Sequence, residues 1–419
     1  MKTIVLGGGV VGVTTAYYLA KDGHDVVVID KHDTVGQEAT NVNAGLIAPA
    51  HCFAWASPAA PKMLVKSIFG EKTSIRVKPT LSPRFLWWGL QFLRECTSTR
   101  ARANTLAKLE LSDYSQRKLA EIAATEGIEY DGVNQGLLYL YRDAEELELG
   151  LMKMELLTSH GQKLERLDAA ELAKVDPAFA AAGDVLVGAI HAPNDASGNS
   201  EKFSRNLMER CKAMGVEFKF GVTAKKFTEE NGVITGLETD QGTMTADNYV
   251  LALGVGSPFL SRSVGQDIPV YPAKGFSLTV DIKDKAKAPT LGGVDEKTLV
   301  AWSPMGDKLR ISSTAMFSGY DKSFEESDFD NIINTAKELW PDAVDWSTAK
   351  MTAGLRPMTP DGPPIIGKGS KHANLYYNTG HGHMGWTMSC GSSALLADLI
   401  AGRKPEISTE AFKVRAIRK

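Results

Sequence analysis

The chain has 419 residues, enough for two or three domains with a large buried core. Its 47 Lys and Arg residues nearly balance 50 Asp and Glu residues, and the net charge of -3 gives no electrostatic basis for nucleic-acid binding. The four cysteines, Cys52, Cys96, Cys211 and Cys390, lack Cys-x-x-Cys spacing. They are typical of buried thiols in a reducing compartment and argue against a disulfide framework or a metal site.

The N-terminus superficially resembles a signal peptide, because Lys2 precedes an apolar run. We reject this interpretation, since glycines at a meaningful spacing interrupt the run and cleavage would remove the strongest motif in the chain. No stretch approaches 18 uninterrupted apolar residues, so no membrane-spanning helix is expected. The sequence therefore predicts a cytoplasmic protein.

The first thirty residues predict a βαβ unit. Thr3 to Leu6 is a short apolar strand, Val10 to Lys21 a helix that Gly23 ends, and Val26 to Ile29 a second buried strand. Asp30 closes the second strand, 18 residues after Gly12. This order of strand, helix, strand and acid is typical of a dinucleotide-binding fold.

Glycines connect the first strand to the helix in a G-x-G-x-x-G pattern formed by Gly7, Gly9 and Gly12. Gly7 permits the turn, Gly9 lets backbone approach a pyrophosphate, and Gly12 lets the helix pack on the strand. The helix N-terminus at Val10 and Val11 offers N–H groups to phosphates. A purely structural glycine turn is the alternative.

Two residues at the end of the second strand complete the expected dinucleotide site. Asp30 is suited to accept hydrogen bonds from ribose hydroxyls, and Lys31 follows it.

The segment from Lys31 to His51 favours FAD over NAD, because it is polar and glycine-punctuated and does not begin another standard repeat. A flavin protein inserts a loop here that follows the cofactor towards its isoalloxazine ring. Within this loop the residues expected at the cofactor are Asn43, Ala44, Gly45 and Leu46. An ordinary turn asparagine is the alternative for Asn43.

The pattern becomes mainly helical between about Phe53 and Asp184, which predicts an inserted substrate or cap region. Long helices are expected from Ala101 to Thr125 and from Ala144 to His160, with a strand from Gly136 to Asp143 between them. The most apolar patch, Phe85 to Leu93, is interpreted as a core helix. Contact with a membrane surface or a partner is the alternative.

An α/β pattern resumes with a helix from Ser200 to Met214 and a strand from Val216 to Phe220. Val222 is then expected near the adenine. Turns at Asn231-Gly232 and Gln241-Gly242 predict hairpins, and Tyr249 to Leu253 predicts a strand. Gly254 follows that strand and is expected beside the cofactor.

The last third predicts a second sheet and the remainder of the cofactor site. The elements expected are strands at Pro269 to Val280, Lys308 to Thr314 and Leu375 to Asn378, and helices at Asp328 to Leu339 and Gly385 to Ile400. The helix N-terminus at Gly385 is expected to stabilise negative charge on a reduced flavin. Cofactor contacts are expected from Gly354, Gly380, Gly382, His383, Met384, Gly385, Trp386 and Thr387.

The chain resembles the FAD-dependent superfamily that includes glycine oxidase and D-amino acid oxidase, and within it the small-subunit family of bacterial D-amino acid dehydrogenases. The resemblance rests on "VLGGGVVGVTTAYYLAKDGHDVVVID", "NAGLIAP", "PNDASGN", "VYPAKGFSLTV", "GLRPMTPDGPPIIG" and "NTGHGHMGWTMSCGSSALLADLIAG". It implies oxidative deamination of D-amino acids to 2-oxo acids and ammonia, with FAD as cofactor. It further implies a quinone or similar electron acceptor and peripheral association with the inner face of the cytoplasmic membrane.

The same resemblance implies an α/β fold of the glutathione-reductase type, like that of amino acid oxidases. A Rossmann-like FAD-binding domain would comprise residues 1–52, 185–262 and 352–419. A second, α+β substrate domain on an antiparallel sheet would comprise residues 53–184 and 263–351. The segment "APAHCFAWASPAAP" departs from a family pattern that usually carries glycine and tyrosine, which leaves substrate preference open and admits a hydroxyproline-type imino acid.

Arg356 is the leading candidate for substrate binding, because it lies in the arginine motif "GLRPMTPDG", a stretch of small, apolar and turn-forming residues. A planar guanidinium matches a carboxylate bidentately and would orient an amino acid over the flavin. An arginine that bonds loop carbonyls is the structural alternative. Secondary candidates for substrate contact are Tyr271, Lys274, Tyr320 and His51, with His381 and His383 as polar wall groups.

Three functions remain open from sequence. The first is a flavin D-amino acid dehydrogenase, the second a related oxidase or imino-acid dehydrogenase, and the third a non-catalytic flavin-bound assembly subunit. No general base can be identified, and neither the oligomeric state nor a covalent flavin link is indicated.

Overall fold

Two large β-sheets organise the chain in the computed structural model, which describes residues 1–68, 75–78 and 82–415. The first has six strands in the order β19-β20-β13-β1-β2-β9. Its strands are β1 Lys2–Leu6, β2 Asp25–Asp30, β9 Glu217–Phe220, β13 Asn248–Leu251, β19 Ile365–Lys368 and β20 Leu375–Thr379. All neighbours pair in parallel except β19 and β20. This is the Rossmann-like sheet that the N-terminal βαβ pattern predicts.

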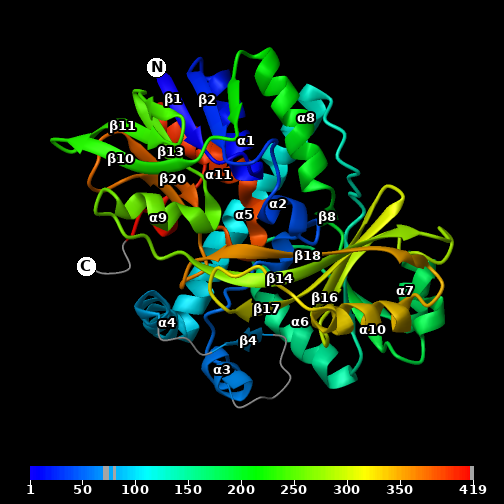
Figure 1. Ribbon diagram of the computed structural model, residues 1–419. Coiled ribbons are helices and arrows are strands. Elements are labelled where there is room, and N and C mark those ends of the chain that lie inside the picture. The colour runs from blue at the N-terminus through cyan, green and yellow to red at the C-terminus, as the bar shows by residue number, and fades with distance from the viewer. Residues whose placement is uncertain (69–74, 79–81, 416–419) are drawn as a thin grey trace.

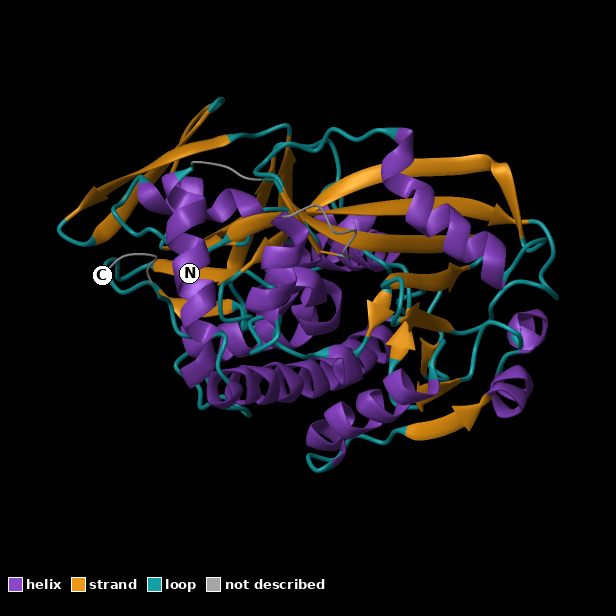
Figure 2. Cartoon of the chain, turned by 90° about the horizontal axis from the view of Figure 1, so that it is seen from below, coloured by secondary structure: helices purple, strands orange, loops and turns teal. Residues whose placement is uncertain are grey.

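The second sheet is mostly antiparallel and has nine strands, in the order β18-β14-β17-β16-β15-β5-β7-β6 with β4 paired to β17. Its strands are β4 Ile75–Val77, β5 Leu137–Tyr141, β6 Glu165–Asp168, β7 Gly188–Ala192, β14 Tyr271–Ile282, β15 Gly292–Asp295, β16 Val300–Met305, β17 Lys308–Phe317 and β18 Val344–Met358. Figure 2 shows its long strands with helices on either side. The α/β class with a second, largely antiparallel sheet is confirmed. The proposed domain boundaries stay a prediction, and the one at residue 352 falls inside β18.

Two smaller sheets complete the strands. One is the hairpin sheet of β10 Ala224–Glu230, β11 Val233–Thr239 and β12 Gly242–Met244, and the other pairs β3 Leu46–Ile47 with β8 Ala196–Ser197. Asn231 has a φ of 50° and Gly232 of 77°, so the expected turn between β10 and β11 is confirmed.

The helices are α1 Val10–Lys21, α2 Ala39–Val42, α3 Ala60–Ile68, α4 Pro83–Glu95, α5 Ser98–Glu126, α6 Ala144–Thr158, α7 Ala169–Val175, α8 Ser200–Ala213, α9 Ser257–Arg262, α10 Asp330–Leu339 and α11 Gly385–Ile400. The expected long helices therefore match α5, α6, α8, α10 and α11 to within a few residues. None of the helices that the structure describes is long and apolar enough to cross a membrane.

Helix α11 is buried and packs against both α1 and α5. A Cβ added to Gly391 would lie 2.8 Å from the backbone of Ser115 on α5, and the Gly391 amide donates to the Ser115 hydroxyl at 3.0 Å. The small face of this helix is therefore required for close packing. This packing fixes the start of α11 relative to the first sheet.

The expectation of a turn-forming segment around Arg356 is wrong for its first part, because Gly354 to Met358 form the end of strand β18. This strand pairs with β14 from Tyr271 to Ile282 and so gains backbone hydrogen bonds that outweigh weak local strand preference. Because β18 is an edge strand, Pro357 is tolerated there.

The prediction of a core helix at Phe85 to Leu93 is half right. In α4, Trp88 and Phe92 are buried and pack with Tyr271 and Phe317. The opposite face exposes large apolar side chains to solvent. The apolar composition alone could not distinguish a fully buried helix from one with an exposed apolar face.

Candidate active site

A cavity of about 1610 Å³ extends between the two large sheets and reaches both β1 and β18. Ordinary small-molecule pockets are about 300–1000 Å³. Its walls are mainly apolar, and they come from segments far apart in sequence, including the first βα turn, the loop after β2 and the start of α11. The cavity is thus large enough for a dinucleotide and a second small molecule.

The turn between β1 and α1 depends on two of its glycines. Gly7 has a φ of 113°, a left-handed conformation that favours glycine. A Cβ on Gly12 would lie 1.8 Å from the Gly7 carbonyl oxygen, so only glycine allows α1 to start this close to β1. Gly9 lines the cavity and is the N-cap residue of α1. Because glycine has no side chain, Gly9 does not cover the start of the helix. This is a phosphate cradle at a helix N-terminus.

Asp30 lies at the end of β2 and lines the same cavity. Its carboxylate accepts hydrogen bonds from the amide of Gly8 at 2.6 Å and from that of His32 at 2.9 Å. These bonds hold the carboxylate beside the cradle, where a ribose hydroxyl would have to bind.

The loop after β2 is held in place by hydrogen bonds of the Asn43 side chain. Asn43 accepts from the Gly45 amide at 2.8 Å and donates to the Ser200 hydroxyl at 2.7 Å. Asn43 therefore fixes the loop on α8 rather than serving as a loose turn residue. A Cβ on Gly45 would lie 2.4 Å from side-chain atoms of Ser303 and Met305, so Gly45 has a packing role.

The structure brings most predicted cofactor residues to the cavity wall. Those on the wall are Gly7, Gly9, Val10, Val11, Asp30, Lys31, Asn43, Ala44, Leu46, Val222, Gly254, Gly354, Gly382, His383, Met384, Gly385, Trp386 and Thr387. Gly12, Gly45 and Gly380 are not part of the wall, and each instead packs closely against other protein atoms.

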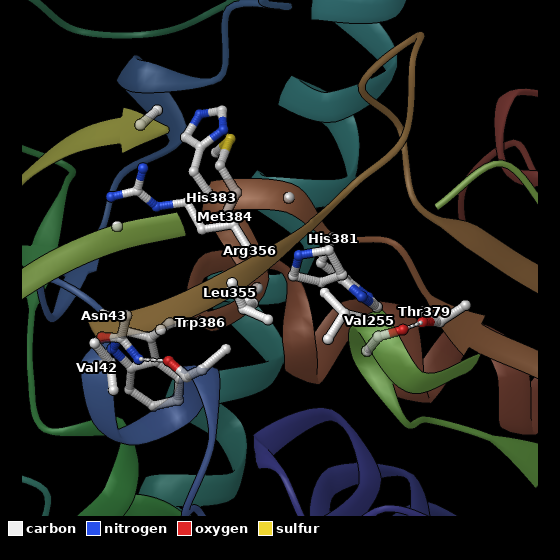
Figure 3. A pocket seen from close by; sticks show the side chains of 18 of the residues that line it. Val42, Asn43, Val255, Leu355, Arg356, Thr379, His381, His383, Met384 and Trp386 are labelled. Atoms are coloured by element: carbon white, nitrogen blue, oxygen red, sulfur yellow. Dashed lines mark hydrogen bonds between the residues drawn. The ribbon is translucent and has the colours of Figure 1, made fainter. Parts of the chain in front are cut away.

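Arg356 projects from the end of β18 into the cavity, beside His383 and Met384 (Figure 3). Its guanidinium lies over Gly275 of β14, where an added Cβ would be 2.5 Å from Nη2 and 2.7 Å from Cζ. Burial lowers the pKa of Arg356 to about 10, which leaves the group charged at neutral pH. The site therefore presents a fixed cation in an apolar cavity, suited to a carboxylate.

Two histidines on the wall are held by aromatic neighbours. The ring of His383 stacks on Trp55 with centroids 5.0 Å apart, and the ring of His51 stacks on Tyr139 at 5.5 Å. The two imidazoles meet edge to face at 6.4 Å. Burial holds the pKa of His383 well below its ordinary value, and the positive charges of Lys108 and Arg356 add to this effect. His383 is therefore neutral at physiological pH.

The third predicted wall histidine, His381, lies apart from His383, as Figure 3 shows. His381 shares a hydrogen bond of 2.9 Å with the Ser392 hydroxyl, and burial lowers its pKa to about 3. It is a neutral residue that ties the loop before α11 to that helix.

Three secondary candidates lie around β14, but not all of them reach the cavity. Tyr320 lines it. Tyr271 and Lys274 are buried and are not part of the wall. Lys274 donates to the Ser323 carbonyl at 2.7 Å and lies 3.6 Å from the Asp321 carboxylate, so it holds the loop of Tyr320 in place.

Sequence reasoning missed Glu296 and Lys108. Glu296 follows β15, lines the cavity and has its Oε1 atom 3.3 Å from His51 Nε2. Lys108 is buried in α5, where its ammonium donates to the Phe53 carbonyl at 3.2 Å. An acid directly after a strand and a lysine on the apolar face of α5 are the signals that could have indicated them.

The residues present fit FAD. The first amide of α1, at Val10, donates to the Thr40 hydroxyl at 3.0 Å, and the glycine turn before it suits a pyrophosphate. Asp30 suits a ribose, and the cavity continues to the start of α11, where backbone and His383 would face the flavin ring. Among the described residues, no cluster of metal-ligating side chains was found.

Comparison with known proteins identifies the family of the chain. The model of the family described as "FAD dependent oxidoreductase" matches residues 2–399. The chain belongs to this family of FAD-dependent oxidoreductases, and FAD is its cofactor. Within the family, the chain is 42% identical to D-amino acid dehydrogenase 2 of Mesorhizobium japonicum over 98% of this chain and 99% of that protein. It is 40% identical to a D-amino acid dehydrogenase of Allorhizobium ampelinum, over 97% and 96%.

Solved structures share the fold at lower identity. Glycine oxidase from Geobacillus kaustophilus superposes with a TM-score of 0.75 at 22% identity, covering 99% of this chain and 98% of that one. L-proline dehydrogenase from P. horikoshii gives a TM-score of 0.75 at 19% identity, with 99% and 96% covered. The predicted amino acid oxidase-like fold is thereby confirmed.

Proposed function

We propose that this protein oxidises D-amino acids to 2-oxo acids and ammonia. The observation that carries the proposal is Arg356, a charged guanidinium fixed on β18 in the apolar cavity beside the start of α11. An amino acid carboxylate is the anion that such a group would hold beside a flavin. The names of the relatives supply the D configuration.

The residues of the chain supply orientation and exclusion of water. Arg356 would bind the carboxylate in two parallel hydrogen bonds, which fixes the α-carbon in one position. Trp55 and the neutral ring of His383 form an apolar wall beside it, so water is displaced as the substrate enters. When bound, FAD supplies the acceptor for the hydride from the α-carbon. Bulk water then suffices to hydrolyse the imine.

Anaerobic mixing of the purified flavoprotein with a panel of D-, L- and cyclic imino acids tests the proposal. We expect loss of the oxidised flavin absorbance with D-amino acids. Preference for a hydroxyproline-type imino acid would instead support the second function, and no reduction by any compound would support a non-catalytic subunit. Arg356→Ala should retain FAD while raising KM by about 10²-fold or more. Loss of FAD without a KM effect would assign Arg356 a structural role.

We further propose that a quinone, rather than oxygen, accepts the electrons. The support is the dehydrogenase name shared by the relatives and the apolar character of the cavity near α3 and α4, where Met63 and Phe92 form part of the wall. Stopped-flow reoxidation of the reduced protein by a soluble quinone should be much faster than reoxidation by dissolved oxygen. Faster reaction with oxygen would make the protein an oxidase.

A peripheral membrane contact fits the outer surface of α3 and α4, two helices at the same corner of the molecule (Figure 1). Large apolar side chains on this surface are 40 to 52% exposed, namely Met63, Val65, Leu86, Trp87, Leu90 and Leu93. Lys62 and Arg94 are exposed on the same two helices and would favour anionic headgroups.

Sedimentation with phosphatidylglycerol vesicles tests this contact. Leu86→Asp with Leu90→Asp should abolish binding, whereas Val233→Asp, at an exposed apolar residue of the hairpin sheet, should not. Equal binding by all three proteins would exclude the α3 and α4 surface.

A further inference from the structure

His51 is held in one orientation at the cavity wall. Its ring lies parallel to that of Tyr139, with an interplanar angle of 5° and centroids 5.5 Å apart. Its Nε2 atom is 3.3 Å from Glu296 Oε1. A 180° rotation of the ring would keep the stack but would move Nε2 away from Glu296, so the carboxylate favours the orientation in which Nε2 faces it.

The support behind this ring is also fixed. The Tyr139 hydroxyl donates to Asp195 Oδ2 at 2.6 Å, and the amide of Ala50 donates to the other Asp195 oxygen at 3.2 Å. Both Tyr139 and Asp195 are fully buried. Asp195 therefore connects the ring under His51 with the residue that precedes His51 in the chain. Burial raises the pKa of Asp195 to about 7, and its hydrogen bonds from Tyr139 and Ala50 offset part of the cost of burying its charge.

Glu296 is placed by the end of β15, where its amide donates to the Leu140 carbonyl at 3.1 Å. Burial alone would raise the pKa of Glu296. The contact with His51, together with the charge of Lys153, outweighs burial and holds the pKa of Glu296 below its ordinary value. Glu296 is therefore ionised, and a His51 tautomer that carries its proton on Nε2, towards this carboxylate, has its acceptor at Nδ1.

The geometry points to a catalytic dyad: resting on the function proposed above, we propose that His51 removes a proton from the substrate ammonium group and that Glu296 positions His51. The ammonium N–H bond breaks, its electron pair stays on the substrate nitrogen, and a new N–H bond forms at Nδ1. The imidazolium then lies beside the Glu296 carboxylate, which stabilises its charge. The amine that remains is neutral, as loss of hydride from the α-carbon requires.

The order of groups across the cavity agrees with this role. His383 lies beside Arg356 (Figure 3), and its ring meets that of His51 edge to face at 6.4 Å. An amino acid bound by its carboxylate at Arg356 would therefore extend past His383 towards His51. The other groups that face the dyad are Tyr139, which stays neutral because burial raises its pKa, and Lys153, whose ammonium lies 4.2 Å from the Phe53 ring centroid. The Tyr139 hydroxyl, which keeps its proton, is therefore not the base.

The limiting rate of anaerobic flavin reduction, measured against pH on the holoenzyme with a saturating D-amino acid, tests the dyad. We expect His51→Asn to lower this rate at pH 7 by about 10² to 10⁴-fold. The difference in rate between His51→Asn and the wild type should become smaller as the pH approaches the pKa of the substrate amine, because an amine that is already neutral needs no base. Glu296→Gln should give a smaller deficit with the same pH trend. Tyr139→Phe retains the stack under His51 but loses the bond to Asp195, so it should lower the rate less than His51→Asn does.

A second readout concerns the dyad independently of turnover. Imidazole ¹⁵N NMR should show His51 protonated at Nε2 in the wild type and a changed tautomer balance in Glu296→Gln. A deficit in His51→Asn that is equal at all pH values, or an unchanged tautomer in Glu296→Gln, would overturn the dyad. If the wild-type flavin is not reduced by any D-amino acid, the proposed function fails. Reduction that is unaffected in both variants refutes the dyad alone.

Discussion

Gly275 on β14 leaves the space that the guanidinium of Arg356 occupies. The alanine Cβ in Gly275→Ala would lie 2.5 Å from Nη2, about 0.9 Å short of the 3.4 Å at which ordinary contact begins. The backbone of Gly275 has no positive φ, so alanine adds no strain of its own. The arginine must therefore move by about 1 Å, and a displacement of this size in a positioned group costs about 10²-fold in rate.

Steady-state kinetics with a D-amino acid measure this effect as a fall in kcat/KM of about 10²-fold, with FAD content unchanged. The control is a double-mutant cycle with Arg356→Ala, because the added methyl group should cost almost nothing once the guanidinium is absent. A similar loss from Gly275→Ala in both backgrounds would show that the methyl group obstructs the cavity itself. An unchanged kcat/KM in the single variant would refute the position assigned to the guanidinium.

Three further outcomes follow from the site. Burial lowers the pKa of Lys108 to about 8 from 10.5, so between these values the unfolded chain holds a proton that the folded protein has lost, and stability rises with pH. Below pH 8 Lys108 is charged in both states, and keeping this charge buried costs the folded protein about 3 kcal/mol. Lys108→Met removes the buried charge and should raise the free energy of unfolding at pH 7 by up to that amount. Urea titrations measure the change. Gly12→Ala should abolish FAD retention, measured by the absorbance ratio of the purified protein, because its Cβ would lie 1.8 Å from the Gly7 oxygen. Arg356→Lys should raise KM by about 10-fold or more while FAD content stays constant, since an ammonium cannot form the bidentate contact; an unchanged KM would show that charge alone suffices.

The N-terminal half of the cofactor site could be predicted because its chemistry is local. The turn at Gly7, the close approach at Gly12 and the acid at Asp30 are set by residues within one βαβ unit. The long helices were also predictable, since each repeats its apolar pattern over several turns. Sequence and structure agree where a single segment determines its own conformation.

The remainder of the site depends on contacts between distant segments. Strand β18 was missed because Gly354 and Pro357 are weak strand formers, and only pairing with β14 makes them extended. Glu296 and His51 are far apart in sequence, so no spacing could reveal their contact. Of β14, only Gly275 lines the cavity, and the sequence did not show that Tyr271 and Lys274 would be buried away from it.

The position of Arg356 on β18, an edge strand paired with β14, separates carboxylate binding from side-chain recognition within the cavity. Its guanidinium position follows from the β14–β18 register, whereas His51 and Trp55 belong to a connecting segment between β3 and α3, and Tyr320 to the loop after β17. Such segments tolerate changes of sequence and length more readily than a paired strand does. Sequence changes in these connecting segments would therefore alter the part of the cavity that receives the substrate side chain, while Arg356 continues to bind the carboxylate. To change the substrate specificity, variant libraries should therefore diversify residues 53–60 and 318–324 and leave β14 and β18 unchanged.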